Sequence, residues 1–192
     1  MYVRDAKNRD EPWLLEGIES MGLDSQAFRS RDYVIAVDET SNTRVGFGRL
    51  RIHPDDPDVC ELTGIGVDPD WRGQGVGAHV IERLVAEAGD NDFETVYVLT
   101  DQAAYLEQFG VREIDADSLP EPLARRLEYK RGQVSEDVVP LAVAPAGFSM
   151  PTRLREAFKT ATGEERDPEP AAAAEDFGID PDEATYKYDT GR

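Results

Sequence analysis

The hydrophobic pattern in the middle of the chain predicts a strand that leads into an amphipathic helix. Residues 60–67 are largely apolar, and a glycine-rich turn follows them. Apolar residues then recur at intervals of three and four, which is typical of a helix with one buried face. These residues are Val76, Val80, Ile81, Leu84, Val85 and Ala88. The turn therefore lies at the start of a helix, where the first backbone amides have no partner within the helix.

The remaining patterns predict a mixed α/β fold. Strands are expected at residues 2–4, 33–38, 44–53, 60–67, 95–100 and 137–143, and helices at 11–22, 103–109, 119–127 and 153–161. Three meandering strands followed by helix, strand and helix indicate a central, mostly antiparallel sheet flanked by helices. Pro140 cannot donate to a ladder, which predicts an edge or a bulge for the last strand. Residues 138–143 would then be available as a contact in a homodimer.

Composition divides the chain into three parts. Residues 1–132 hold the predicted α/β domain, and residues 133–162 form a C-terminal extension with one strand and one helix. Residues 163–192 are rich in Glu, Asp, Pro and Ala, including four consecutive alanines at 171–174. A segment of this composition cannot bury enough apolar surface to fold, so we expect the acidic tail to be disordered.

The chain is strongly acidic, with 40 Asp and Glu against 21 Lys and Arg and a formal net charge of −19. Residues 1–132 alone carry 27 acids and 15 bases, a difference of −12, so the tail does not explain the total. Molar salt shortens the screening length to about 3 Å and removes most of the resulting repulsion. We therefore expect a cytoplasmic protein of an extreme halophile; the alternative is an ordinary acidic enzyme with an acidic tail. Either way, the charge argues against non-specific nucleic-acid binding.

Several other classes of protein are disfavoured. No apolar run is long enough to span a membrane, and the first residues lack the pattern of a signal peptide. The single cysteine, Cys60, excludes an internal disulfide framework. With only two histidines, His53 and His79, no metal site is expected.

The glycine-rich turn has the chemistry of a phosphate site. Glycines keep side chains away, so the free amides at a helix start can surround a pyrophosphate, aided by the helix dipole. Tight packing alone is one alternative. A dinucleotide site is another, because Gly73-x-Gly75-x-x-Ala78 with Asp101 matches that fingerprint. Against it, residues 68–72 separate the strand from the glycines, and the preceding segments predict antiparallel hairpins.

The same residues carry a family resemblance. Arg72-x-x-Gly75-x-Gly77, preceded by Val67-Asp68-Pro69, resembles the acyl-coenzyme A signature of the GNAT acetyltransferases. The resemblance covers residues 1–132 and implies the GNAT fold, with acetyl-CoA as cosubstrate. It also implies that the pyrophosphate is bound by Arg72, Gly73, Gln74, Gly75, Val76 and Gly77. The pantetheine arm would pair with the backbone of Ile65, Gly66 and Val67, where Gly64 and Gly66 leave one strand face bare.

The resemblance also suggests catalytic residues. Glu61 lies where many family members carry an acidic residue, which implies that it is the general base that deprotonates the amine. An acid at the start of a strand can equally be just a solvated side chain. Backbone amides around Val67 would stabilise the oxyanion.

The general acid departs from the family pattern. Counting back from Gly110, Tyr105 takes the place of a phenylalanine and Leu106 that of the tyrosine that protonates the leaving thiolate. Leucine cannot donate a proton. Tyr105 is therefore the candidate acid, with a packing role as the alternative.

The acceptor substrate is expected to be a small amine that bears a carboxylate. Arg49 and Arg51 share one strand face with His53 and could bind a carboxylate, although they could also form an exposed face. Leu99-Thr100, Leu119-Pro120 and residues 129–131 resemble the acetyltransferase domain of N-acetylglutamate synthases, which suggests glutamate. The alternatives are acetylation of protein N-termini or lysines, and a non-catalytic acyl-CoA-binding module.

Overall fold

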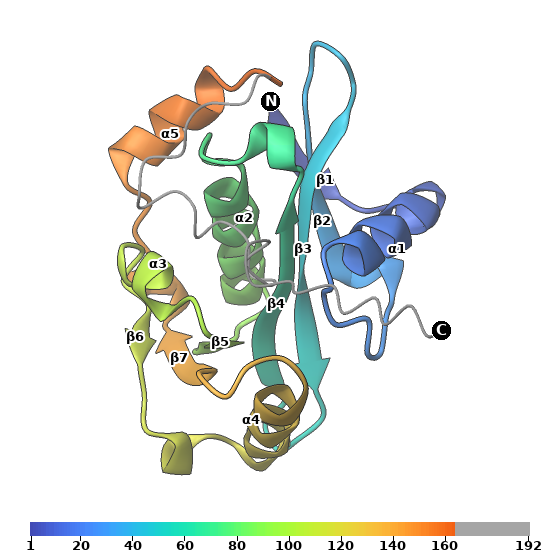
Figure 1. Ribbon diagram of the computed structural model, residues 1–192. Coiled ribbons are helices and arrows are strands. Elements are labelled where there is room, and N and C mark those ends of the chain that lie inside the picture. Colours follow the sequence, from blue (N-terminus) through green and yellow to red (C-terminus); the bar gives the residue numbers. More distant parts are fainter. Residues whose placement is uncertain (164–192) are drawn as a thin grey trace, which may run out of the picture.

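The structure, a computed structural model, describes residues 1–163 and contains one seven-stranded sheet (Figure 1). The strand order is β1-β2-β3-β4-β5-β7-β6. The strands are β1 (Tyr2–Asp5), β2 (Tyr33–Val37), β3 (Arg44–His53), β4 (Val59–Val67), β5 (Val96–Thr100), β6 (Arg112–Glu113) and β7 (Val139–Val143). Only the β4–β5 pair is parallel within this sheet. The predicted mixed, mostly antiparallel sheet is confirmed, whereas the predicted disorder of the tail concerns residues outside the described part.

Helices cover both faces of the sheet. They are α1 (Glu11–Ser20), α2 (Val76–Asp90), α3 (Ala103–Glu107), α4 (Glu121–Gln133) and α5 (Thr152–Lys159). In Figure 1, α1 and α2 lie on opposite sides of β2, β3 and β4, and α4 lies at the far end of β3. None of these helices is long and apolar enough to span a membrane, as far as residues 1–163 show.

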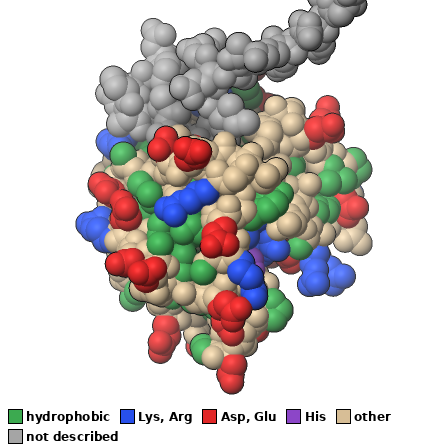
Figure 2. Space-filling view, turned by 60° about the horizontal axis from the view of Figure 1, so that its bottom comes forward, with side chains coloured by type: hydrophobic (Ala, Val, Ile, Leu, Met, Phe, Trp, Pro, Cys, Tyr) green, Lys and Arg blue, Asp and Glu red, His purple; other side chains and the backbone are tan. Residues whose placement is uncertain are grey.

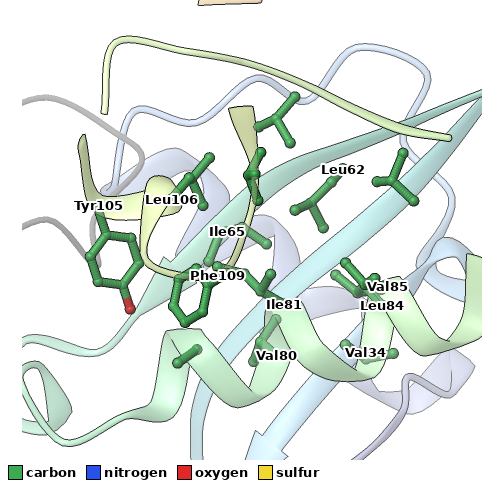
Figure 3. Close-up of a cluster of buried hydrophobic side chains, with 14 of the residues drawn as sticks. Val34, Leu62, Ile65, Val80, Ile81, Leu84, Val85, Tyr105, Leu106 and Phe109 are labelled. Carbon is green, nitrogen blue, oxygen red and sulfur yellow. The ribbon is translucent and has the colours of Figure 1, made fainter. Parts of the chain in front are cut away.

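The largest core lies between the sheet and α2. Leu62 and Ile65 of β4 contact the buried face of α2, and Leu106 and Phe109 close the cluster from the side of α3 (Figure 3). The periodic apolar residues that predicted α2 are all buried. Burial of this stripe explains why the segment is helical, because each apolar side chain on it leaves water.

Strand β7 differs from the prediction. It is not an edge: it pairs with β5 along its whole length and with β6 on its other side. The Pro140 carbonyl accepts a hydrogen bond from the Ile114 amide at 3.0 Å, so the proline nitrogen faces the same side. Strand β6 has two residues, opposite Leu141 and Ala142, so no ladder bond is lost at Pro140. Residues 139–143 are therefore not a free edge for a dimer, and the sheet continues across residue 132.

Candidate active site

Strands β4 and β5 separate halfway along their length. Their parallel pairing joins Cys60–Leu62 to Val96–Val98 and ends there, although β4 continues to Val67. Just past this point β4 contains a bulge, because Arg49 pairs with Thr63 while Phe47 pairs with Gly66. Gly64 has φ +63°, a left-handed conformation that suits glycine. The bulge and the divergence together open the sheet.

A pocket occupies the opening between the two strands. One wall is formed by Thr63, Gly64 and Ile65, and the opposite wall by the C-terminal end of β5 up to Asp101. The loop at residues 22–24 and Lys130 of α4 complete the lining. The predicted pantetheine-binding residues Ile65, Gly66 and Val67 thus lie on the strand that borders this opening. The space beside Gly66 is taken up by Phe47 and Met21, which gives this glycine a packing reason of its own.

The glycine-rich turn lies at the N-terminus of α2, as expected. Gly75 is the residue before the helix and has φ +76°. No described residue accepts a hydrogen bond from the backbone amides at positions 73, 75, 76 and 77. Two side chains hold the turn in place: Arg72 Nε donates to the Val67 carbonyl at 3.2 Å, and Gln74 Nε2 donates to the Asp70 carbonyl at 3.1 Å. These amides fit a phosphate group, because they are donors at the positive end of a helix dipole.

Helix α5 lies directly against this turn. A side chain at Gly75 would collide with the Leu154 carbonyl of α5. The His79 ring stacks on Phe158, with centroids 3.8 Å apart, and the Thr162 amide donates to Gln74 Oε1 at 2.8 Å. Gly75 is therefore required for the packing of α5 whether or not the turn binds a phosphate.

The residues that lead into α5 pack against Phe109, just after the end of α3. The Phe148 ring stacks on Phe109 at 5.4 Å, and the Ser149 amide donates to the Phe109 carbonyl at 2.9 Å. Residues 147–163 therefore bridge from α3 to the N-terminus of α2, across the upper part of the molecule in Figure 1. Sequence patterns predicted the helix in this segment but not the position in which it packs.

Glu61 is fully buried in a cluster of charged side chains. Its carboxylate contacts His53 Nε2 at 2.7 Å, Arg126 Nε at 3.0 Å and Lys130 Nζ at 3.4 Å. Burial by itself would raise the pKa of Glu61. The cations of Lys130 and Arg126 and the hydrogen bond from His53 outweigh it and hold that pKa well below its usual range. A carboxylate so stabilised is a weak proton acceptor, so these contacts argue against Glu61 as the general base.

Two residues of α4 complete this cluster. Arg126 forms a second ion pair with Asp24 from the loop after α1. Lys130 Nζ donates to the Leu99 carbonyl at 2.8 Å, at the edge of the pocket. Burial lowers the pKa of Lys130, and the charge of Glu61 partly offsets this. Glu61 thus fixes a cation on each side, one facing the pocket between the strands and the other the loop.

The two arginines predicted to bind substrate have different environments. Arg49 is fully buried, and its terminal nitrogens donate to the carbonyls of Gln26 at 2.8 Å and Ala27 at 3.2 Å. Arg51 is half-buried and contacts the Gln26 side chain at 3.3 Å. It lines a second, more open pocket together with His53, Arg125, Arg126 and Tyr129. Figure 2 brings the α4 end of the molecule forward and shows Lys and Arg side chains beside a histidine, among acidic side chains.

Tyr105, the candidate general acid, is buried with its ring edge against Phe109, 5.3 Å between centroids. Leu106 is fully buried in the α2 core (Figure 3). Glu61 belongs to the sheet face covered by α1 and α4, and Tyr105 to the face covered by α2. The two predicted catalytic side chains therefore flank the opening from opposite faces of the sheet.

Sequence reasoning missed Asp24, His53, Arg126 and Lys130 as members of one site. Arg126 and Lys130 are four residues apart, which places both on one side of a helix. That spacing could have indicated that the two cations lie side by side, but the helix was predicted to end at residue 127, before Lys130.

Comparison with known proteins assigns the family. Residues 3–110, more than half of the chain, match the acetyltransferase (GNAT) family, so the chain belongs to this family. The amino-acid acetyltransferase of Escherichia coli K12 is 27% identical over 94 residues, which cover 48% of this chain and 21% of that relative. The amino-acid acetyltransferase of Mycobacterium tuberculosis is 34% identical over 71 residues, 37% of this chain and 40% of that relative. The chain thus spans between a fifth and two fifths of the length of these curated relatives.

Solved structures show the same fold. A Mycobacterium tuberculosis protein crystallised in complex with CoA has a TM-score of 0.62 and 20% identity, covering 75% of this chain and 99% of that one. The N-acetylglutamate synthase of Neisseria gonorrhoeae, complexed with coenzyme A and N-acetyl-glutamate, has a TM-score of 0.61 and 18% identity. The matched region covers 74% of this chain and 34% of the synthase chain. The predicted GNAT fold is confirmed.

Proposed function

We propose that this protein transfers an acetyl group from acetyl-CoA to the primary amine of a small metabolite that bears a carboxylate, such as glutamate. One observation carries the acceptor class. In a chain of net charge −19, the part of the opening lined by β3, β4 and α4, here called the acceptor side, gathers four cations, Arg49, Arg51, Arg126 and Lys130. Glu61 and Asp24 are the carboxylates paired with them, Asp32 is half-buried near Arg49, and Asp101 is exposed at the pocket edge. Buried charges of one sign in excess favour a ligand of the other sign.

The amides at positions 73–77 would hold the pyrophosphate of acetyl-CoA, and the edge of Ile65–Val67 that β5 does not pair would hold its pantetheine arm. Residues 65–67 lie between the glycine-rich turn and Gly64, which lines the pocket just beyond the point where β4 and β5 separate. An amine in the pocket would then attack the thioester carbonyl directly: the C–N bond forms, the C–S bond breaks, and the proton lost by the amine ends on the leaving CoA thiolate, which gives the amide and free CoA thiol. No covalent enzyme intermediate is needed.

We assign Glu61 a positioning role. Its carboxylate holds Arg126 and Lys130 at fixed places beside the pocket, at 3.0 and 3.4 Å. This replaces the general-base role expected from sequence. Loss of the carboxylate would leave Lys130 without an ion-pair partner and Arg126 with Asp24 alone, which would disturb the binding of a substrate carboxylate.

The shape of the site favours a small acceptor over a protein. The pocket is closed on one side by the loop at residues 22–24 and on another by α4. A protein N-terminus or lysine would need an open groove instead. A non-catalytic acyl-CoA-binding module is a second candidate, favoured by the buried Leu106 in the place of the usual proton donor.

The test is thiol release from acetyl-CoA across a panel of amines, in molar KCl. We expect glutamate and related amino acids to be acetylated and amines without a carboxylate to be poor acceptors. Acetylation of carboxylate-free amines at equal rates would overturn the acceptor class. Acetyl-CoA binding without turnover of any amine would favour the binding module.

We also infer that the protein works in the salt-rich cytoplasm of a halophile. Acidic side chains are spread over the face in Figure 2. Melting temperatures measured from low to molar KCl should rise steeply, because screening removes repulsion among these carboxylates. A melting temperature that does not depend on salt would contradict this.

A further inference from the structure

The buried side-chain nitrogen and oxygen atoms that lack a hydrogen-bond partner gather at the acceptor side. Within residues 1–163 they belong to Asp24, Tyr33, Arg49 and Arg126. Asp24 and Arg126 face each other as an ion pair. The Tyr33 hydroxyl and Arg49 Nε are then left as donors without an acceptor. Both lie on the sheet face that carries Glu61, and polar groups without a partner are rare enough in protein interiors to need a reason.

The Tyr33 hydroxyl lies beside the bulge of β4. Tyr33 is 1% exposed, and its hydroxyl is 3.8 Å from the position that a Cβ on Gly64 would occupy. Gly64 is part of the pocket wall, and it carries no side chain that could separate the hydroxyl from the pocket. The Arg49 guanidinium lies over the Tyr33 ring, 5.5 Å from its centroid. The two unpartnered donors are therefore neighbours behind the same short stretch of backbone.

The ring of Tyr33 is well packed without its hydroxyl. It contacts the rings of Phe28 at 5.5 Å and Phe47 at 6.2 Å, in the apolar cluster under α1. A phenylalanine would make the same ring contacts and would bury no unpaired donor. Burial raises the pKa of Tyr33 to about 12, so the hydroxyl keeps its proton and can act as a donor. Packing alone thus gives no reason for a tyrosine here.

We propose that Tyr33 is a substrate-binding residue whose hydroxyl donates a hydrogen bond to a carboxylate oxygen of the acceptor amine at the Gly64 bulge, with Arg49 Nε as the second donor. The acceptor class rests on the proposed function. A carboxylate oxygen suits the position because both unpartnered atoms are donors and one of them is charged, while the nearby Asp24 carboxylate is already paired with Arg126. The other nitrogens of Arg49 hold the loop at Gln26 and Ala27, so Nε is the atom left for a ligand.

Tyr33→Phe tests the proposal because it removes only the hydroxyl. We expect the melting temperature to stay the same or rise, the KM for glutamate to rise at least about tenfold, and the KM for acetyl-CoA to change less than about twofold. Tyr97→Phe is the matched control, since Tyr97 is a partly buried tyrosine on the same face of the sheet. It should change neither KM.

A second measurement separates this proposal from the proposed function. Glutamate should raise the melting temperature of the unmodified protein and not that of Tyr33→Phe, whether or not any amine is acetylated. An unchanged KM and an unchanged glutamate shift in Tyr33→Phe would overturn the role of Tyr33, with or without a loss of stability. Absence of thiol release together with a glutamate shift that depends on Tyr33 would sustain the binding role and refute the enzymatic activity.

Discussion

The two sides of the opening between β4 and β5 are built in opposite ways. On the side of the glycine-rich turn, here called the turn side, the Arg72 and Gln74 side chains hold the turn and α5 packs against it. On the acceptor side, Glu61 lies among buried cations, and the buried side-chain polar atoms of residues 1–163 that lack a partner gather there. On the first side α5 packs against the turn, and the unpartnered groups are backbone amides; on the second side they are buried side-chain donors for which residues 1–163 supply no acceptor. Buried polar groups without partners reduce stability, so their concentration on one side points to a ligand.

The largest expected effect comes from Glu61→Gln. The change leaves Lys130 as a buried cation without a carboxylate and leaves Arg126 with Asp24 alone, and the two cationic side chains are only 11% and 3% exposed. The free energy of unfolding should fall by about 3–5 kcal/mol. Equilibrium unfolding by urea in molar KCl measures this, and thiol release per folded molecule should also fall.

Asp10→Asn is the matched control. Asp10 is also fully buried, and it pairs with Arg4 at 2.7 Å and Arg44 at 2.9 Å, away from the pocket. These cations are 20% and 34% exposed, so they can regain water when the carboxylate is lost. We expect a smaller loss of about 1–3 kcal/mol with turnover per folded molecule unchanged. Equal losses of activity in both variants would remove the distinction between the two carboxylates.

Acid sharpens the same comparison. The depressed pKa of Glu61 means that its stabilising contribution is present above the pKa of the unfolded chain and is lost as the pH falls through the folded value. The difference in stability between the unmodified protein and Glu61→Gln should therefore shrink in acid. A difference that grows as the pH falls would show that the carboxylate is not held ionised by its cations.

Within residues 1–163, local patterns predicted the five α-helices and every strand except the two-residue β6, with some ends shifted. The return strand of the hairpin at residues 44–53 and the helix after the glycine-rich turn are found where the apolar spacing indicated. The GNAT fold followed from the turn itself, because a strand, a short connection and a glycine-rich helix start are consecutive in the chain. These features depend on neighbours a few residues apart, which a sequence displays directly.

The acceptor side could not be predicted in the same way. Glu61 and Arg126 are 65 residues apart, and they meet only because α4 packs at the end of β3 and β4. Helix α4 continues to Gln133 through a polar segment, so apolar periodicity did not mark its last turns. Arg49 and Arg51 share a strand face as predicted. Of the two, only Arg49 donates hydrogen bonds to backbone carbonyls of the loop after α1, and a strand pattern could not show this contact.

The next largest effect is expected for Phe158→Ala, at the glycine-rich turn against which α5 packs. Phe158 is 8% exposed and stacks on His79, so its loss should lower the free energy of unfolding by about 3 kcal/mol and loosen α5. Because α5 lies against the turn, acetyl-CoA should then bind several-fold more tightly, as less of the protein must rearrange. Isothermal titration measures this affinity. Leu127→Ala, which removes a buried side chain of α4, is the control and should leave the affinity unchanged. Weaker binding in Phe158→Ala would mean that α5 forms part of the cosubstrate site.

The smallest effect is expected for Arg51→Met, on the acceptor side. Arg51 is half-buried with one long hydrogen bond, and burial together with the nearby Arg126 lowers its pKa. Removing it relieves repulsion among the cations, so the free energy of unfolding should change by less than about 1 kcal/mol.

Arg51 should nevertheless affect substrate binding, because it contributes to the positive potential of the site without being needed for the fold. The KM for glutamate should rise several-fold in Arg51→Met, and the rise should be smaller in molar than in moderate KCl, since salt screens a half-exposed charge. Arg49→Met, in contrast, should lose stability outright, because Arg49 secures the loop at Gln26 and Ala27. If Arg51→Met leaves the KM for glutamate unchanged at both salt concentrations, the acceptor is recognised by the buried donors Tyr33 and Arg49 and not by Arg51. The open cationic pocket would then take no part in this recognition.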